Sequence, residues 1–306
     1  MRNVRRCGGP LALCALVAGV AMAAADSGAE QAGGTAVRQA PAGVRLYVFD
    51  CGTLEGADIT RFGLKANEVA TIKMSVACYL VVHPKGTLIW DVGAVPDTAW
   101  TPTGQPIAQR IVLADSQERT VTVRKRLDAQ LSEAGHPPSA ITHVALSHNH
   151  WDHTANANQF GRATWLVRQE EHAVMFPAKP ASGALTLPAT FSALRASKTV
   201  LINTDEHDVF GDGTVIAKLT PGHTPGHLVL YVKLAKTGGI VLSGDLYHYP
   251  EERTLSRVPI FEVSQEQTRT ARGVVDAFLT KTGSQLWIQH DFAADAKLKK
   301  APAYYE

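Results

Sequence analysis

The stretch His148-Asn-His-Trp-Asp-His153 decides the fold of this chain. It sets three imidazoles and one carboxylate within six residues, directly after the apolar run Ile141–Ser147. Borderline divalent metals such as zinc prefer these ligands. In an extended segment the first two histidines project to one side, and the aspartate and third histidine follow in the turn. One segment can therefore serve two metal ions. The alternative is a loop that binds no metal, formed by chance among twelve histidines in 306 residues.

Three later segments each place one candidate ligand within or just after an apolar run. They are Thr220-Pro-Gly-His-Thr-Pro-Gly-His227, Ile240-Val-Leu-Ser-Gly-Asp245 and Gln285-Leu-Trp-Ile-Gln-His290. In a layered α/β fold the ends of strands gather at one edge, where loops build sites. We therefore expect His223, Asp245 and His290 to converge on the first cluster.

The order of these motifs resembles the metallo-β-lactamase-fold hydrolases, from about Val44 to about Phe292. The resemblance implies an α/β fold of the αββα type, with two sheets sandwiched between helices. It also implies two divalent metal ions. The implied ligands are His148, His150 and His223 for the first metal, Asp152, His153 and His290 for the second, and Asp245 as the bridge.

Two further residues are expected behind these ligands. By the same resemblance Asp91, in Leu88-Ile-Trp-Asp-Val-Gly93, orients the metal-binding loop by hydrogen bonding. The alternative for Asp91 is a turn residue before Gly93. In the family the first histidine of the Pro-Gly-His-Thr-Pro-Gly-His loop, here His223, is the metal ligand. The second, His227, is therefore expected to support the ligands or line the pocket.

Residues 1–25 have the composition of a signal peptide. Arg2, Arg5 and Arg6 precede the short apolar run Leu11–Ala25, which ends in small residues. The run is short for a membrane span, so an uncleaved anchor is the less favoured alternative and no stable membrane anchor is expected. Residues 26–42 are expected to be a disordered lead-in, and residues 43–306 one hydrolase domain. We expect a periplasmic or secreted protein.

The charge of the chain argues against a polyanionic partner. Loss of residues 1–25 removes three arginines and no acid, so the formal net charge falls from +2 to about −1. A near-neutral surface is not suited to nucleic acid. We therefore expect a small-molecule substrate. A homodimer through the long loop Gly52–Lys73 is plausible by resemblance.

The mature cysteines are Cys51 and Cys78, both in or beside predicted strands. Two buried free thiols are the favoured interpretation. A disulfide is the alternative, because an oxidising compartment would permit one. Neither cysteine stands at a metal-ligand position.

The periodicity predicts alternating strands and helices. A helix is predicted over Val121–Ala134, a short one over Gln169–Phe176 and a long one from the capping box at Ser264 to Thr282. Strands are predicted over 44–50, 75–82, 87–90, 164–167, 215–219, 228–234 and 240–242, with another that bears His290. The segment Gly52–Lys73 is predicted to be a long loop whose apolar side chains line a pocket or a dimer contact.

The expected chemistry is hydrolysis. Two metals held close would share a water, lower its pKa toward neutrality and direct the resulting hydroxide at a carbonyl. Asp152 could pass a proton to the leaving group as well as bind metal. No serine or cysteine nucleophile is required, and the sequence has no Gly-x-Ser-x-Gly motif.

Within the superfamily the chain is most similar to the N-acyl homoserine lactonases, which open a lactone ring. That branch carries a tyrosine three residues after the bridging aspartate, whereas here Tyr247 is two residues after Asp245 and His248 is three after. Either Tyr247 or His248 is therefore expected to assist the oxyanion, with ordinary loop packing as the alternative for both. The metal is expected to be zinc, and iron, manganese or cobalt would also suit the ligands.

Two other functions remain open. The first is a β-lactamase-like amidase or a general ester or thioester hydrolase of the same fold. Asp245 argues against the antibiotic-hydrolysing branch, which commonly places cysteine or serine at that position. The second is a zinc-binding module without catalysis, which would bind metal and turn over no ester, lactone or lactam.

Overall fold

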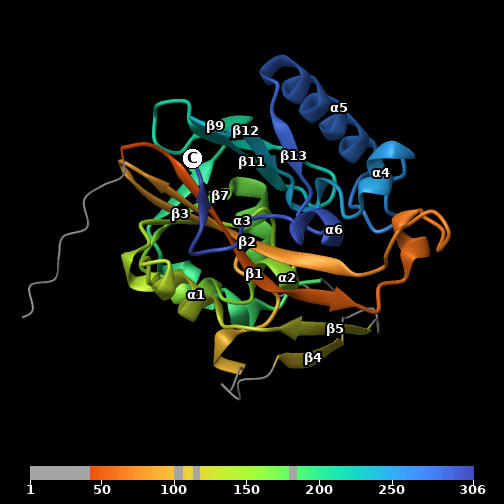
Figure 1. Cartoon of the computed structure of the whole chain (residues 1–306), viewed down its shortest axis with the longest axis horizontal. Coiled ribbons are helices and arrows are strands. Elements are labelled where there is room, and N and C mark those ends of the chain that lie inside the picture. The colour runs from red at the N-terminus through yellow and green to blue at the C-terminus, as the bar shows by residue number, and fades with distance from the viewer. Residues whose placement is uncertain (1–41, 100–105, 113–117, 179–184) are drawn as a thin grey trace, which may run out of the picture. The chain divides into compact units, whose positions relative to one another are not determined.

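The computed structural model describes residues 42–99, 106–112, 118–178 and 185–306. The predicted signal peptide, and all of the predicted lead-in except residue 42, lie outside the described residues. Two β-sheets form the centre of the fold (Figure 1). Within the described ranges no helix is both long and apolar enough to cross a bilayer.

The larger sheet has nine strands in the order β4-β5-β1-β2-β3-β6-β7-β8, with β14 paired to β1. Strands β1 and β2 pair in antiparallel register, and β3, β6, β7 and β8 run parallel to one another. The bounds are β1 Arg45–Glu55, β2 Met74–His83, β3 Gly86–Trp90, β4 Ile107–Val112, β5 Glu118–Val123, β6 His143–Ala145, β7 Thr164–Arg168, β8 Thr199–Ile202 and β14 Tyr304–Tyr305.

The smaller sheet has five strands in the order β13-β12-β11-β10-β9. Its strands pair in antiparallel fashion except β12 and β13, which are parallel. The bounds are β9 Glu206–Asp208, β10 Val215–Leu219, β11 Leu228–Leu234, β12 Gly238–Leu242 and β13 Gln285–Trp287.

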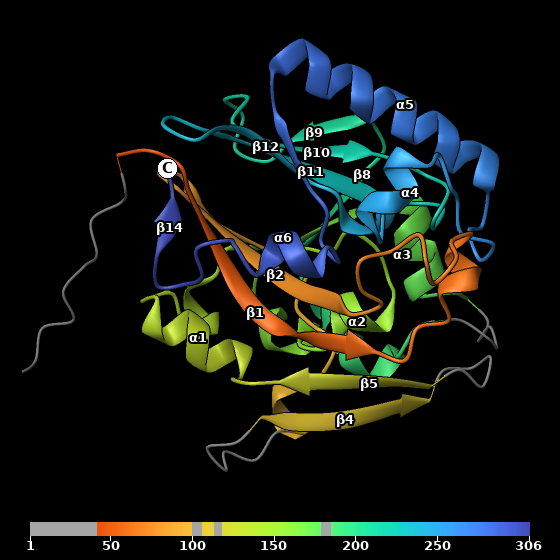
Figure 2. The same cartoon turned by 45° about the vertical axis from the view of Figure 1, so that its right-hand side comes forward.

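Helices cover the outer faces of the sheets. The α-helices are α1 Leu127–Glu133, α2 Trp151–Thr154, α3 Gln169–Met175, α4 Pro250–Thr254, α5 Gln265–Thr282 and α6 Phe292–Asp295. The 3₁₀ turns are η1 Ile59–Phe62, η2 Asp97–Ala99, η3 Pro138–Ala140, η4 Ala157–Phe160, η5 Pro188–Thr190, η6 Ser192–Ala196 and η7 Gly244–Leu246. Figure 2 shows α5 along the outer side of the smaller sheet and α1 beside the larger one.

The alternation of side chains along β1 explains the layering. Leu46 and Val48 pack between the sheets with residues of β10, β11 and β12, whereas Tyr47 and Phe49 face the core that holds Leu127 and Leu131 of α1. The predicted αββα sandwich is therefore confirmed. Both faces of each sheet carry apolar side chains. Each sheet is therefore stabilised by packing against the other sheet on one face and against helices on the other.

The long helix α5 begins and ends as the sequence predicts. The Ser264 side chain accepts a hydrogen bond from Gln267 N at the start, and Gly283 adopts the left-handed conformation at the end. Ala271, Val275 and Leu279 of α5 pack on the smaller sheet. These positions are four apart, so they share one helical face.

Three sequence predictions are wrong in part. The helix predicted over Val121–Ala134 is instead the end of β5 followed by α1. The predicted loop Gly52–Lys73 begins with the last residues of β1 and contains η1. The cysteines Cys51 and Cys78 form a disulfide rather than two free thiols. Cys78 of β2 is opposite Phe49, and Cys51 lies two residues further along β1, in the bulge between Asp50 and Thr53, so that the two Cα atoms are 5.9 Å apart.

Candidate metal centre

The expected ligands meet where strands from both sheets end. His148 and His150 follow β6, and Asp152 and His153 lie on α2. Three more ligand candidates come from the smaller sheet, since His223 follows β10, Asp245 lies in η7 after β12, and His290 follows β13. All seven are brought into two adjacent groups, as the sequence predicts.

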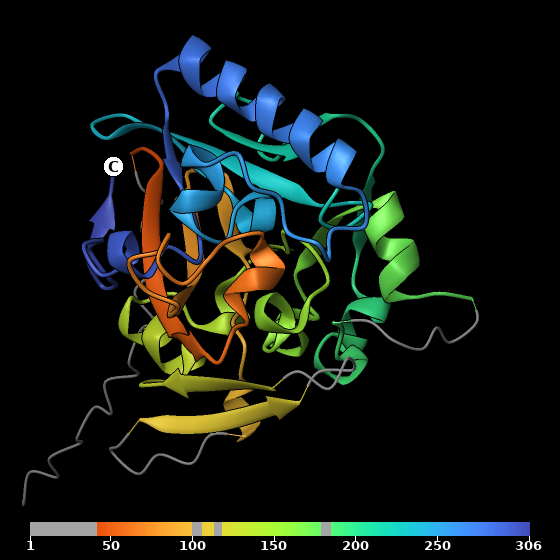
Figure 3. The ribbon, with the colours of Figure 1, turned by 90° about the vertical axis from the view of Figure 1, so that its right-hand side faces the viewer.

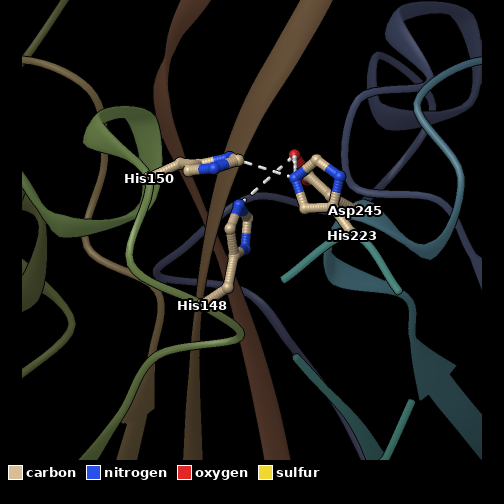
Figure 4. A group of neighbouring side chains, drawn as sticks. All are labelled: His148, His150, His223 and Asp245. Atoms are coloured by element: carbon tan, nitrogen blue, oxygen red, sulfur yellow. Dashed lines mark hydrogen bonds and ion pairs between the residues drawn. The ribbon is translucent and has the colours of Figure 1, made fainter. Parts of the chain in front are cut away.

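The first group contains His148, His150, His223 and Asp245, whose ligand atoms lie within 4.8 Å of one another. Figure 4 shows the three imidazoles directed at one point beside the aspartate. The His223 Nε2 atom lies 3.0 Å from His150 Nδ1 and 3.3 Å from Asp245 Oδ2. Asp245 Oδ2 also lies 3.5 Å from His148 Nε2. Three nitrogens and one oxygen at this spacing match the tetrahedral donor set that zinc prefers.

The second group contains Asp152, His153 and His290. The Nε2 atoms of the two histidines lie 3.1 and 3.0 Å from the other carboxylate oxygen of Asp245, Oδ1. Each also lies 3.7 Å from an oxygen of Asp152. Asp245 therefore directs one oxygen at each group, which is the arrangement of a bridging ligand.

The unsatisfied atoms of the cluster fit a pair of divalent cations. The Nε2 atoms of His148, His153 and His290, and Oδ1 of Asp245, are buried and have no hydrogen-bond partner. Buried polar atoms without partners are costly, so native proteins keep them where a bound species satisfies them. The structure is thus compatible with a dinuclear metal centre.

The electrostatics of His148, His150 and Asp245 favour the metal-binding protonation states, whereas those of two other candidate ligands do not. Burial opposes protonation of His153 and His223, but the carboxylates beside them, Asp245 and Glu262 respectively, raise the pKa of His153 well above its usual value and that of His223 to about 9. Burial lowers the pKa of His148 and of His150 well below the ordinary value, so these imidazoles are neutral. Burial alone would raise the pKa of Asp245, but the imidazoles around it, with His153 first, hold that pKa well below its usual range. Neutral imidazole and ionised carboxylate are the forms that bind metals.

Asp91 lies directly behind the metal-binding loop. It accepts hydrogen bonds from Ser147 N at 2.7 Å and Ser147 Oγ at 2.9 Å, and from His153 Nδ1 at 2.9 Å. Its backbone is left-handed, with φ 52°, which is uncommon for a residue with a side chain. The hydrogen bond to Nδ1 leaves the Nε2 lone pair of His153 directed at the cluster. This is the orienting position expected from the sequence.

His227 supports the bridging residue rather than the metals. Its Nε2 accepts a hydrogen bond from Asp245 N at 3.0 Å, and its Nδ1 lies 2.8 Å from Thr220 Oγ1. Burial lowers the pKa of His227 to about 3, so it remains neutral and can accept that bond.

The glycines of the Pro-Gly-His-Thr-Pro-Gly-His loop are required by close packing. A Cβ atom on Gly222 would lie 2.3 Å from Thr268 N of α5, and one on Gly226 would lie 2.6 Å from Glu171 N of α3. Gly222 also has φ +138°, which side chains rarely allow. The loop therefore carries His223 only because both positions lack side chains.

Three buried glutamates contact His223, the two histidine loops and His248, and the sequence did not predict their roles. Glu262 accepts from His223 Nδ1 at 2.9 Å. Glu171 accepts from Asn149 N at 2.7 Å and from Gly226 N at 3.0 Å, so it joins the two histidine loops. Glu252 lies 3.2 Å from His248 Nδ1 and 2.6 Å from Arg272. Of the three, Glu252 had a local signal, because Pro250 and the two glutamates that follow are typical of a helix start.

The structure separates the two candidates for assisting the oxyanion. His248 lines the cleft over the cluster, with Nε2 3.2 Å from Asp245 Oδ2. Tyr247 does not line it, so the structure favours His248, and the catalytic role of Tyr247 remains a prediction. Because η7 ends in extended backbone, consecutive side chains point to opposite sides. The Tyr247 ring is packed in the α5 core beneath the Arg272 guanidinium, 4.1 Å away.

A cleft opens above the two groups of candidate ligands. His150, Asp152, His223, Asp245 and His248 form its floor. Its walls are mainly apolar and consist of Leu54, Phe62, Met74, Trp151, Leu185 and Phe261, together with Arg61 and Arg119. Leu54 and Phe62 belong to the segment expected to line a pocket, whereas Ile59 and Leu64 are buried in the core instead. Figure 3 shows the orange segment with η1 beside the light-blue segment that follows α4.

The sequence matches the profile of the metallo-beta-lactamase superfamily over residues 72–281. N-acyl homoserine lactonase AttM from Azorhizobium caulinodans is 28% identical over 265 residues, which cover 86% of this chain and 99% of that relative. An N-acyl homoserine lactonase from Bacillus cereus is 22% identical over 242 residues, covering 76% of this chain and 88% of the relative.

Solved structures share the fold. An N-acyl homoserine lactone hydrolase with the product N-hexanoyl-L-homoserine at its catalytic metal center superposes with a TM-score of 0.65 at 20% identity, covering 85% of this chain and 98% of the other. AidC, a dizinc quorum-quenching lactonase, superposes with a TM-score of 0.60 at 18% identity, covering 86% and 93%.

The profile covers more than half of the chain, so the protein belongs to the metallo-beta-lactamase superfamily. It is a metal-dependent hydrolase of that superfamily, and its seven candidate ligands form two adjacent groups, of which His150, Asp152, His223 and Asp245 line the floor of one cleft.

Proposed function

We propose that this protein opens the lactone ring of N-acyl homoserine lactones and thereby quenches quorum signals. The observation that carries the proposal is the cleft, which sets an apolar wall over two ligand groups that share Asp245. An acyl chain fits against Leu54, Phe62 and Phe261 while the polar ring lies on the floor. The curated lactonase from Azorhizobium caulinodans, aligned over nearly its full length, supports the same substrate.

Two divalent ions, which we propose to be zinc, would be held by the two ligand groups and would supply Lewis acidity and an activated water. The protein supplies the proton chemistry. Asp152 lines the cleft and can carry a proton to the alcohol oxygen that leaves when the ring opens. His248 can donate from Nε2 to the oxygen on which negative charge develops. Glu252 Oε1 accepts a hydrogen bond from the His248 backbone N–H and lies 3.2 Å from its Nδ1.

We also propose that the protein acts in the periplasm or outside the cell. The basic start and apolar run of residues 1–25 support export. The Cys51–Cys78 disulfide is suited to an oxidising compartment. Fractionation of cells that express the full chain, followed by mass determination of the recovered protein, tests both export and cleavage.

The decisive experiment measures metal and activity on one preparation. Bound metal is quantified, and acid release is followed with a panel of acyl homoserine lactones and a cephalosporin. About two metals per chain with fast lactone opening and negligible lactam cleavage is the expected result. Dominant lactam cleavage would reassign the protein to antibiotic hydrolysis. Bound metal with no turnover of ester, lactone or lactam would indicate a metal-binding module.

A further inference from the structure

A second cavity, with a volume of about 320 Å³, lies between α4 and α5. Helix α4 and the turn after it contribute Arg253 and Ser256, α5 contributes Arg269 and Arg272, and Tyr247 reaches the cavity from the end of η7. Figure 2 shows α4 beside α5. Among the described residues, none lines both this cavity and the cleft, and no candidate metal ligand lines the cavity. A molecule in this cavity would therefore bind apart from the site of hydrolysis.

The hydroxyl of Tyr247 is a buried polar group whose partner is not supplied by the protein. The side chain is only 2% exposed, and its ring is packed beneath the Arg272 guanidinium. The hydroxyl forms no hydrogen bond within the part of the chain that the structure describes, and it is not fully enclosed. The open space that Tyr247 lines is this cavity. Because a buried tyrosine hydroxyl usually has a partner, a molecule in the cavity can supply the one that is missing here.

The charges that line the cavity leave one guanidinium without a counter-charge. Arg272 Nη2 donates to Glu252 Oε2 at 2.6 Å, so this pair is neutral. Arg253 Nη2 donates to Asp276 Oδ1 at 2.8 Å, so this pair is neutral as well. Arg269 forms no hydrogen bond or ion pair with any residue that the structure describes. The described lining thus has three guanidinium groups against two carboxylates, a net charge of about +1.

We propose that this cavity binds a tetrahedral oxyanion, either free phosphate or the phosphate group of a larger molecule. The Arg269 guanidinium would pair with the anion, and the hydroxyls of Tyr247 and Ser256 would donate further hydrogen bonds. These donors come from three segments of the chain, and a phosphate group offers at least three acceptor oxygens, whereas a carboxylate offers two. The inference concerns a second site and does not depend on the proposed lactonase function.

The test measures the binding of inorganic phosphate to the full metal-loaded chain by calorimetry. Wild type should bind with a Kd on the order of 1 mM. Arg269→Gln should weaken this binding about tenfold, and Tyr247→Phe about threefold, because each removes a donor. Asp276→Ala should instead tighten it about threefold, because it removes a carboxylate from the lining and frees Arg253. Arg162→Gln, which removes an exposed guanidinium that does not line the cavity, is the matched control and should keep the wild-type Kd.

The opposite signs at Arg269 and Asp276 distinguish this cavity from the metal ions of the cleft, which also attract phosphate. The inference is wrong if wild type binds no phosphate well above the expected Kd. It is also wrong if both variants keep the wild-type Kd, since the anion then lies elsewhere. Metal content and thermal unfolding of each variant verify that it is folded.

Glycerol 3-phosphate, titrated in the same way, distinguishes the two sources of the anion. Tighter binding of this ester than of inorganic phosphate, weakened in Arg269→Gln, would identify the phosphate group of a larger molecule as the ligand. Weaker binding of the ester would identify free phosphate.

Discussion

The floor and the upper wall of the cleft are built differently. Directly beneath the floor, the candidate ligands His148, His153 and His290 are almost completely buried, and each has its second nitrogen within hydrogen-bond distance of a fixed oxygen. The upper wall consists of η1 and the segment 255–263. The Phe62 ring of this wall contacts Tyr249 and Phe261, but the side chains of Ile260 and Val263 are 64% and 66% exposed.

This difference assigns different tasks to the two regions. The floor is restrained by hydrogen bonds to groups from both sheets, and a reaction site needs such restraint because small displacements of a ligand are costly. The two segments of the wall are joined by a hydrogen bond from Ile260 N to Arg61 O, 2.8 Å long, and by the contact of the Phe62 and Phe261 rings. Loops of this kind can change without disturbing the scaffold, so they are where substrate preference is set.

The largest expected effect is at Asp245, because it faces both ligand groups. Asp245→Ala should reduce bound metal and lower lactone turnover by at least about a thousandfold. Metal analysis and acid release on the same sample measure both. Asp276→Ala removes a carboxylate from the surface of α5, where it pairs with Arg253, and should change neither quantity. A fully metallated, active Asp245→Ala protein would show that the floor does not depend on a bridging carboxylate.

The second-largest effect is expected at His248, and it distinguishes this residue from Tyr247. His248→Asn should lower kcat by about a hundredfold with metal content retained, since it removes a proton donor from the floor. Tyr247→Phe should change kcat by less than about twofold, because its ring lies in the α5 core and keeps its packing. Steady-state kinetics with a metal assay on both variants makes the comparison. The opposite ranking would place Tyr247 in the site.

A smaller effect is expected behind the floor, at Glu262. Glu262→Gln replaces the carboxylate that holds His223 Nδ1, and metal affinity should fall by about 10–100-fold. Competition with a chromophoric chelator measures the change. The matched control is Glu266→Gln, an exposed side chain in the first turn of α5, which should bind metal as the wild type does. Equal affinities in the two variants would mean that the His223 ring is held by its loop alone.

Features that depend on a short local motif could be predicted from the sequence, whereas features that depend on distant partners could not. The ligands stand in short motifs after strands, and α5 carries its cap, its apolar face and its terminal glycine in order. Glu262 could not be predicted, because its partner His223 lies 39 residues away and no local pattern links them. The Cys51–Cys78 disulfide could not be predicted for the same reason. It depends on how β1 pairs with β2, and no local pattern in the sequence specifies that pairing.

One wrong prediction arose from merging two periodicities. Val121 and Val123 are two residues apart, the spacing of a strand, whereas Leu127 and Leu131 are four apart, the spacing of a helix. Because these residues were predicted to form one helix, strand β5 and its pairing with β4 were not predicted. Strand β5 of that pair places Arg119 at the cleft. The wrong prediction of this segment therefore missed a residue of the cleft wall, whereas the prediction of the floor residues was not affected.

The smallest expected effect lies in the upper wall, at Phe261. Phe261→Ala removes part of the apolar surface that contacts an acyl chain and should cost about 1 kcal/mol of binding, which is about fivefold in KM. The loss should be present for long-chain lactones and absent for the shortest. It should leave kcat unchanged, because the ring makes edge contacts with His223 and His248 but supplies neither a metal ligand nor a proton. Val263→Ala, an exposed wall residue outside the cleft lining, is the control. A fall in kcat with every chain length would mean that the wall also positions the floor, and the division between the two regions would then be wrong.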